Sequence, residues 1–409
     1  MVTAFPRSQP ALPMSISLDV TTELLAIYGS PLYVYDGDRL RQSIQHITQA
    51  ISYPHARLCF ASVTNGNLAL LKIFREVGWG LHANTPGDIY LGLHAGFHPS
   101  QIVYSGSNLN SEDMAQVLQW GITTFNLDSL SQVQLLCKME HARDRNLKLG
   151  LRLNYPPLTG DSRIGVQPEE FPEAIALAHQ AGLTITGLHF YRGTGTNATK
   201  AFTQVIDEVI AIAQQLPDWQ YLDFGGGFGY PYRHEGAAFD WYEFGAELGD
   251  RLQRLDRPIE LIIEPGRAAI AGCAVLFTTV VSTKWQAEKQ IVGVDTTVAN
   301  LSVPSVHGGY REIIALSQPG GNTSLATCHP TDVCGNTTYS RDYLGRNCLL
   351  PVLKPGDLLA ILDVGAYGYA MSSHFLHRPR PAEILLENGT RRLIRQREDY
   401  NILLLNQLL

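Results

Sequence analysis

The sequence predicts a (β/α)8 TIM barrel followed by a mostly antiparallel β domain. From about residue 31 to residue 270, short apolar segments alternate with amphipathic segments of helical period. This alternation is typical of parallel strands joined by crossover helices, and about eight such units make a closed barrel. After Arg267 the apolar segments continue without regular intervening helices. The 409 residues suffice for one large barrel and a smaller second domain. We therefore predict an arm over residues 1–30 that joins the β domain, a barrel over 31–270 and the β domain over 271–409.

The elements of the first part follow in regular order. The proline-containing first 15 residues are expected to form a loose arm. Asp36 is a good N-cap for the helix that follows the first strand. Strands are expected at residues 32–35, 57–61, 80–83, 102–105, 124–126, 149–153, 184–190, 221–224 and 260–263. Helices between them are expected at residues 67–77, 86–95, 112–120, 168–181 and 201–215.

The second part contains strand patterns and one long polar region. Strands are expected at residues 274–281, 290–294, 357–362, 382–386 and 391–394. Residues 296–347 are rich in Gly, Ser, Thr and Asn. Long segments of this composition are often functional loops, so we expect loops here.

Composition excludes several classes of protein. The net charge of −7 argues against a nucleic-acid partner, because such a binder usually carries a basic face. No apolar run reaches the roughly 18 residues of a membrane span, and no secretory signal pattern opens the chain. Cys328, His329 and Cys334 give an incomplete ligand set for zinc, so no metal is expected. Six cysteines without a C-x-x-C pair suit a cytoplasmic protein with reduced thiols.

Three motifs suggest a ligand site. Residues 223–229 read D-F-G-G-G-F-G directly after a strand. The glycines let backbone N–H groups converge on an anion, although a turn that only needs tight packing has the same composition. Glu264-Pro265-Gly266-Arg267 ends another strand, where a barrel keeps its site. A surface Glu–Arg pair is the alternative. Small residues surround Tyr367 in a tight turn that either faces a ligand or only packs.

Together, in this order, the motifs resemble those of the pyridoxal-phosphate (PLP) decarboxylases of the diaminopimelate/ornithine decarboxylase group. The resemblance covers about residues 31–383 and includes residues 161–165 (D-S-R-I-G) and 189–194 (H-F-Y-R-G-T). It implies an alanine-racemase-like fold, PLP as cofactor, and Glu264 on the pyridine nitrogen. It also implies a homodimer in which a loop of one β domain completes the neighbour's site. The phosphate contacts that it implies are Thr194, Gly225, Gly226, Gly227, Gly266, Arg267 and Tyr367.

The residue at position 63 departs from the family pattern. Residues 59–71 read C-F-A-S-V-T-N-G-N-L-A-L-L, where the family has roughly F-Y-A-V-K-A-N-P-N-L-A-L-L. The family's Lys, which bonds the cofactor covalently, therefore falls on Val63, whose isopropyl group cannot form that bond. Lys72 and the other lysines occupy no motif position. We expect PLP to be held non-covalently.

Other departures affect the groups that would move protons or read the substrate. His82 replaces an Asp, Tyr191 replaces the His that stacks on the cofactor, and Val303 replaces an Arg that reads a distal carboxylate. The family loop G-P-x-C-E-S-x-D overlays residues 335–342, and an overlay shifted by four residues would use Cys334 instead. The expected catalytic residues are His82, Tyr191, Thr338 and Asp342, and the expected substrate contacts are Tyr339 and Asp342.

Three functions are compatible with these residues. The first is a PLP-dependent lyase of amino-acid metabolism, which Asp342 tilts towards a basic amino acid because ornithine decarboxylases have an acid there. The second is a remodelled enzyme of the same fold in specialised metabolism. The third is a catalytically inactive homologue with a binding or regulatory role. We lean towards the lyase.

Overall fold

The computed structural model describes residues 5–6, 16–140, 142, 145–193, 195–233, 236–316 and 327–408. The chain forms two compact units. The barrel unit comprises Gln42–Pro231 and Ala237–Ala269, and the β unit comprises Met1–Arg41, Tyr232–Gly236 and Ile270–Leu409. Most of the expected loose arm lies outside the described residues; β1 (Phe5–Pro6) is described and pairs with β14.

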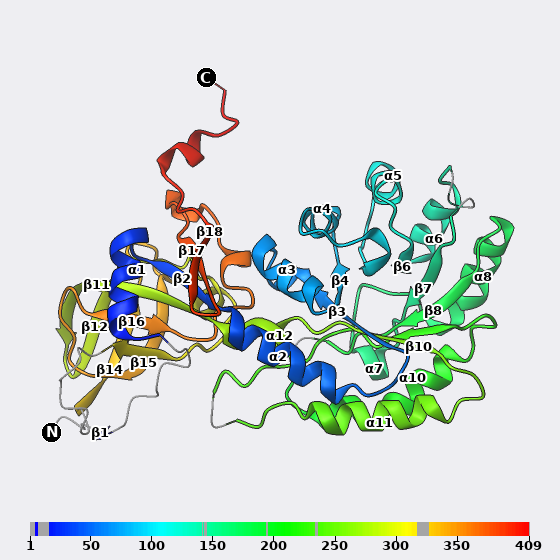
Figure 1. The fold of residues 1–409 in the computed structure, drawn as a ribbon, viewed down its shortest axis with the longest axis horizontal. Coiled ribbons are helices and arrows are strands. Elements are labelled where there is room, and N and C mark those ends of the chain that lie inside the picture. Colours follow the sequence, from blue (N-terminus) through cyan, green and yellow to red (C-terminus); the bar gives the residue numbers. More distant parts are fainter. Residues whose placement is uncertain are drawn as a thin grey trace. The chain divides into compact units, whose positions relative to one another are not determined.

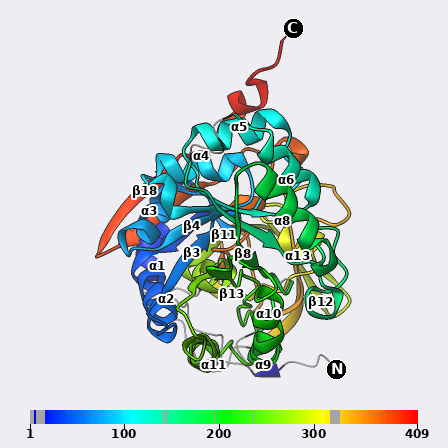
Figure 2. The same ribbon diagram turned by 90° about the vertical axis from the view of Figure 1, so that its right-hand side faces the viewer.

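Eight parallel strands close into a barrel, which confirms the predicted fold class. In chain order they are β3 (Ala56–Ala61), β4 (Gly80–Ala83), β5 (Ile102–Tyr104), β6 (Thr124–Leu127), β7 (Lys148–Arg152), β8 (Ile185–His189), β9 (Tyr221–Asp223) and β10 (Glu260–Ile263). Strand β10 pairs with β3 and closes the ring. Helices lie around the outside of these strands, as Figures 1 and 2 show. They are α3 (Leu68–Glu76), α4 (Pro86–His94), α5 (Ser111–Gln119), α6 (Leu130–Cys137), α7 (Pro156–Thr159), α8 (Phe171–Gln180), α9 (Thr199–Thr203), α10 (Ile206–Ala213) and α11 (Trp241–Gln253).

Side-chain caps fix where the helices begin. Asp36 accepts a hydrogen bond of 2.8 Å from the backbone N–H of Arg39, which confirms it as the N-cap of α2 (Gly37–Ala50). Asn67 caps α3, and Thr85 forms a reciprocal capping box with Asp88 at the start of α4. Each cap satisfies backbone donors that a helix start would otherwise leave unpaired.

Tyr221 fills the interior of the barrel. Its ring lies where glycines on two neighbouring strands leave space. A Cβ atom added at Gly187 would come 2.0 Å from the Tyr221 Cζ, and one at Gly150 would come 2.4 Å from its hydroxyl oxygen. Tyr221 packs in one buried cluster with Cys59, Val103 and Ile262. The small residues therefore allow one large aromatic ring to occupy the barrel's centre, below the ends of the strands.

The β unit is a ten-stranded, mostly antiparallel sheet. Strands run in the order β1-β14-β12-β11-β2-β17-β18, with β15 on β14, and with β16 pairing both β11 and β13. Their bounds are β2 (Leu32–Asp36), β11 (Ala274–Gln286), β12 (Lys289–Val294), β13 (Ile313–Leu316), β14 (Thr327–Cys334), β15 (Tyr343–Leu350), β16 (Leu358–Ile361), β17 (Ala382–Glu387) and β18 (Thr390–Arg395). Helix α1 (Leu18–Tyr28) packs on this sheet through Leu24. The remaining short helices are η1 (Ser62–Thr64), η2 (Pro99–Gln101), η3 (Pro168–Glu170), α12 (Arg267–Ile270), η4 (Ala271–Cys273), α13 (Val303–Val306), η5 (Tyr369–Met371), η6 (Phe375–His377) and η7 (Tyr400–Leu404).

Two expectations about strands were wrong. The alternation pattern groups residues 32–35 with the barrel strands, but β2 pairs with β11 and β17 in the other sheet. The polar region 296–347 was expected to be loops, yet it contains β13, β14 and part of β15. Pro330, Gly345 and Asn347 are poor strand formers, and pairing with neighbouring strands overrides this local preference.

Two general features of the chain bear on its environment. Within the residues that the structure describes, no helix has the length and apolar character needed to cross a membrane. All six cysteines are free thiols.

Candidate functional site

Polar side chains gather where the barrel strands end. His82 lies near the end of β4, Arg152 ends β7, His189 ends β8 and Asp223 ends β9. Glu264 directly follows β10. Parallel strands of a barrel bring their carboxyl ends to one rim, so residues far apart in the sequence become neighbours there.

Glu264 is the centre of this cluster. Its side chain is 3% exposed, with Oε1 3.3 Å from the His82 Nε2 and Oε2 3.5 Å from the His189 Nε2. Among the described residues, neither imidazole makes a hydrogen bond through its ring nitrogens, and Glu264 Oε1 accepts none. Burial lowers the pKa of His189 to about 4 and that of His82 well below its usual value. Both rings are therefore neutral near pH 7, so these contacts are not ion pairs.

A chain of hydrogen bonds from the barrel interior fixes the Asp223 carboxyl group. The Tyr221 hydroxyl donates to the Asn126 Oδ1 at 3.0 Å, and the Asn126 amide donates to Asp223 Oδ2 at 2.8 Å and to the Ser105 Oγ at 3.0 Å. The backbone N–H of Gly225 donates to Asp223 Oδ1 at 3.0 Å. The tyrosine in the barrel centre thus fixes the amide, and the amide fixes the carboxyl group.

Asp223 and Glu264 form a coupled acid pair. Burial raises the pKa of Asp223 well above its usual value, and the charge of Glu264 and a hydrogen bond with it raise this pKa further. Burial also raises the pKa of Glu264 to about 7, against the lowering effects of its hydrogen bond with Asp223 and of the Arg152 charge. Two carboxylates this close share one proton near neutral pH. One negative charge remains, with Arg152 as the nearby cation.

The described residues contain one set of potential metal ligands. His189, Asp223 and Glu264 offer ligand atoms within 4.8 Å of one another. Both oxygens of Asp223 already accept hydrogen bonds, which leaves them less available to a metal ion.

The glycine run after β9 packs tightly against neighbouring strand ends. A Cβ atom at Gly225 would come 2.1 Å from the Phe190 carbonyl oxygen. One at Gly226 would come 2.6 Å from the Glu264 carbonyl oxygen. Gly225 and Gly227 have φ angles of 68° and 96°, in the left-handed region that favours glycine. Close packing and backbone conformation therefore each require glycine here. This geometry is compatible with an anion-binding turn and with a turn that is only tightly packed.

Arg267 and Tyr191 lie beside the same rim. A Cβ atom at Gly195 would come 3.5 Å from the Arg267 guanidinium carbon, so Arg267 packs on the loop that follows β8. The Arg152 guanidinium carbon lies 5.1 Å from the centre of the Tyr191 ring, a cation–π distance. Thr194, expected as a phosphate contact, lies outside the described residues.

Val63 lies in the short turn η1 that follows β3. Its side chain is 45% exposed, which is unusual for valine. The Ser62 hydroxyl donates to the His82 carbonyl at 3.0 Å, which ties the turn to β4. A Cβ atom at Gly266 would meet the Thr64 Cγ2 at 2.7 Å, so the turn of Glu264 to Arg267 packs against it. Position 63 is therefore a surface position of the rim, held rigidly by its neighbours.

The remaining predicted site residues belong to the β unit. Thr338 is exposed, and Tyr339 makes an edge contact with Phe375 at 5.4 Å between ring centres. Tyr367 has a φ of 59°, in the left-handed region that non-glycine residues rarely adopt.

Asp342 is buried within its own loop. Its carboxylate accepts hydrogen bonds from the Val298 backbone N–H at 2.7 Å, from the Thr337 backbone N–H at 3.1 Å and from the Thr297 hydroxyl at 3.1 Å. The Thr337 hydroxyl donates to it at 2.5 Å. These contacts favour a role in ordering the loop over the predicted contact with substrate.

Sequence reasoning did not select four residues of the cluster. They are Asn126, Arg152, His189 and Asp223. Each lies at or near the carboxyl end of a barrel strand, which is the signal that could have found them.

The parallel barrel and the separate, mostly antiparallel sheet make an alanine-racemase-like fold, as predicted. Residues 38–271 match the family model of the pyridoxal-dependent decarboxylases, specifically their pyridoxal-binding domain. The chain belongs to this family of PLP-dependent, fold type III decarboxylases.

Several known proteins are similar to this chain. Diaminopimelate decarboxylase of Methanothermobacter thermautotrophicus is 33% identical over 410 residues, covering 94% of this chain and 93% of that protein. The enzyme of Vibrio cholerae is 32% identical, covering 92% of each. The crystal structure of Helicobacter pylori diaminopimelate decarboxylase with L-lysine has a TM-score of 0.85 at 27% identity, covering 94% of this chain and 98% of the other. The lysine/ornithine decarboxylase of Vibrio vulnificus with putrescine, at 22% identity and a TM-score of 0.79, shares the fold.

Proposed function

We propose that this protein holds PLP non-covalently at the rim of its barrel and binds an amino acid there. The observation that carries the proposal is the buried polar cluster around Glu264 in a chain that has valine at position 63. A buried carboxylate whose Oε1 accepts no hydrogen bond among the described residues suits a protonated ring nitrogen. Arg267, with the backbone N–H groups of Gly226 and Gly227, suits a phosphate, whereas the Gly225 N–H donates to Asp223.

The lysines of the barrel unit support non-covalent binding. Lys72, Lys138, Lys148 and Lys200 are all exposed. Lys148 begins β7, at the end of the barrel opposite the rim, and pairs with Glu260 at 2.6 Å. None of the four lies at the carboxyl end of a barrel strand. A covalent bond to the cofactor therefore has no donor among these lysines at the rim.

We propose that the amino-acid ligand of this protein differs from that of the diaminopimelate decarboxylases at its distal end. Val303, at the position of the Arg that the resemblance assigns to a distal carboxylate, is 7% exposed at the start of α13. A buried isopropyl group cannot bind a carboxylate. The contacts of Asp342 give no support to a basic substrate, because its carboxylate is occupied within the loop. We therefore propose an amino acid without a distal carboxylate.

The residues of the rim have separate tasks in this proposal. When bound, PLP supplies an electron sink for breaking bonds at an amino-acid α-carbon. Glu264 holds the ring nitrogen through its remaining negative charge. His82 and Tyr191 are the groups placed to hold or pass a proton, His82 through a neutral ring whose nitrogens make no hydrogen bond among the described residues. Arg152 balances the charge of the acid pair.

A non-catalytic role is the second candidate, favoured by Val63 together with Thr338 and Tyr339 at positions where the family has Cys and Glu. A remodelled enzyme would use the same binding groups. Release of carbon dioxide from a panel of amino acids, measured with added PLP, separates an active lyase from both.

We also propose a homodimer, in which a β-unit loop over residues 335–342 completes the partner's rim, as the family resemblance implies.

Titration of the purified protein with PLP tests cofactor binding. We expect saturable binding that Arg267→Gln weakens by about tenfold or more, since it removes a charged hydrogen-bond partner of the phosphate. Arg254→Gln is the matched control, because Arg254 is exposed on the barrel unit and makes no ion pair among the described residues. Equal affinity of wild type and Arg267→Gln would contradict the assignment of the phosphate site.

A further inference from the structure

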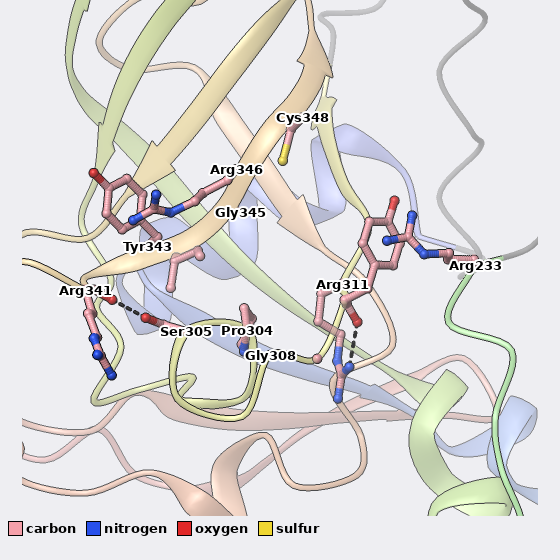
Figure 3. Close-up of a pocket in the computed structure, with 13 residues that line it drawn as sticks. Arg233, Pro304, Ser305, Gly308, Arg311, Arg341, Tyr343, Gly345, Arg346 and Cys348 are labelled. Atoms are coloured by element: carbon pink, nitrogen blue, oxygen red, sulfur yellow. Dashed lines mark hydrogen bonds between the residues drawn. The ribbon is translucent and has the colours of Figure 1, made fainter. Parts of the chain in front are cut away.

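The β unit contains a cavity that none of the residues of the barrel rim lines. It has a volume of about 440 Å³ and lies between α13, the segment that follows it, β15 and Arg233. A cavity of this size accommodates a small molecule. Four of its lining residues are arginines, namely Arg233, Arg311, Arg341 and Arg346, and none is Asp or Glu. Figure 3 shows these side chains around the cavity.

Tyrosine rings orient three of the four guanidinium groups. The guanidinium carbon of Arg346 lies 3.7 Å from the Tyr343 ring centre, and that of Arg233 lies 4.1 Å from the Tyr310 ring centre. Figure 3 shows the Arg346 group lying against the Tyr343 ring. Arg311 lies 3.8 Å from the ring centre of Tyr232. A stacked guanidinium keeps its in-plane N–H groups available, in the fork geometry that matches carboxylate and phosphate.

No acidic residue in the described part of the chain lines the cavity to balance the positive charges of its four arginines. Among the described residues, Arg233, Arg341 and Arg346 make no ion pair, whereas Arg311 donates to the Tyr310 carbonyl at 2.7 Å. Glu312, Asp332 and Asp342 lie outside the lining, and each has another partner. Glu312 accepts a hydrogen bond from the Tyr310 hydroxyl, and Asp332 lies 3.4 Å from the Lys289 ammonium. Like charges gathered in one cavity repel one another, and a bound anion would relieve this repulsion.

We propose that this cavity binds a small organic polyanion, a molecule with two or more phosphate or carboxylate groups. One anionic group would engage Arg346 and Arg341, and another would engage Arg233 and Arg311. The Ser305 hydroxyl donates to the Arg341 carbonyl and fixes the turn before β15 that carries Arg341. Nothing in this proposal depends on the binding of PLP at the barrel rim.

Calorimetric titration at constant ionic strength tests the proposal, with pyrophosphate as the phosphate probe and citrate as the carboxylate probe. We expect at least one of them to bind in a one-to-one ratio and acetate not to bind. The affinity should fall as salt is raised, because exposed charges are screened. Arg233→Gln and Arg346→Gln should each weaken binding by about tenfold, as expected for loss of one charged contact. Both residues are exposed, so these variants should fold.

Two controls make the result specific. Arg392→Gln removes an exposed arginine of the same unit that does not line the cavity, and its affinity should equal that of wild type. Binding should also be unchanged in Arg267→Gln, which separates this site from the barrel rim. Absence of binding by both probes would overturn the proposal. So would equal affinity of wild type and Arg233→Gln/Arg346→Gln, which would mean an adventitious ion only.

Discussion

Replacing Glu264 by Gln should change how the stability of the cofactor-free protein depends on pH. Burial raises the pKa of Glu264 to about 7, from an ordinary value of 4.5. The folded protein therefore binds a proton between these two pH values that the unfolded chain has lost. A group with a raised pKa contributes stability that is fully present below the unfolded value and is lost as the pH rises through the folded value.

The size of the effect follows from the same shift. Each unit of pKa corresponds to about 1.4 kcal/mol, so ionising Glu264 should cost wild type about 3 kcal/mol between pH 4.5 and pH 8. Gln cannot ionise and avoids this cost. We expect the unfolding free energy of Glu264→Gln, relative to wild type, to rise by about 2.5 kcal/mol from pH 5 to pH 8.

Urea unfolding of both proteins at several pH values measures this difference. His189 acts in the opposite direction, because burial lowers its pKa to about 4 and its contribution is lost as the pH falls. Glu264 is not among the causes of that shift, so this contribution is common to both proteins and cancels in the difference. A difference that stays constant from pH 5 to pH 8 would refute the assignment of a shared proton to Asp223 and Glu264.

Three further predictions concern the rim and the β unit. Val63→Lys should allow PLP to be attached covalently after borohydride reduction; a folded, PLP-saturated variant without attachment would contradict the placement of position 63. Asp342→Asn should lower the unfolding free energy by about 3 kcal/mol, because a buried acceptor of several hydrogen bonds loses its charge. The control Asp250→Asn, at an exposed position, should change the unfolding free energy by less than about 0.5 kcal/mol. Equal effects of the two variants in urea unfolding would refute the role of Asp342 in its loop. Mixing Arg267→Gln with Tyr339→Ala should restore part of the amino-acid binding, measured with PLP present, that each variant loses, since mixed dimers would carry one undamaged site; a monomeric protein with full amino-acid binding would exclude the shared site.

The alternation of apolar and amphipathic segments was sufficient to predict the barrel, because each βα unit carries its own local signal. The prediction from this alternation was wrong where a segment outside the barrel has the same local pattern as a barrel unit. Strand β2 followed by α2 has the pattern of a barrel unit, and only the pairing with β11 and β17 shows that it belongs to the other sheet. Strands β14 and β15 are polar and contain Pro330 and Gly345, so their formation depends on neighbours that are distant in the sequence.

Site residues that belong to a sequence motif could be predicted, but the contacts between residues of different strands could not. Glu264 and residues 225–227 belong to recognisable segments. The contact of His82 with Glu264 and the chain from Tyr221 through Asn126 to Asp223 arise only when the barrel closes. A single sequence shows which residues end strands, but only the folded barrel brings ligand atoms of His189, Asp223 and Glu264 within 4.8 Å of one another.

Reduction of the PLP-saturated protein with borohydride, followed by mass spectrometry of the intact chain and its peptides, tests the central claim most directly. Reduction fixes the cofactor to any lysine that has bonded it. We predict that the wild-type chain keeps its unmodified mass, although PLP binds saturably before reduction. A pyridoxyl group on Lys72, Lys200 or any other lysine at full occupancy would contradict non-covalent binding at the rim.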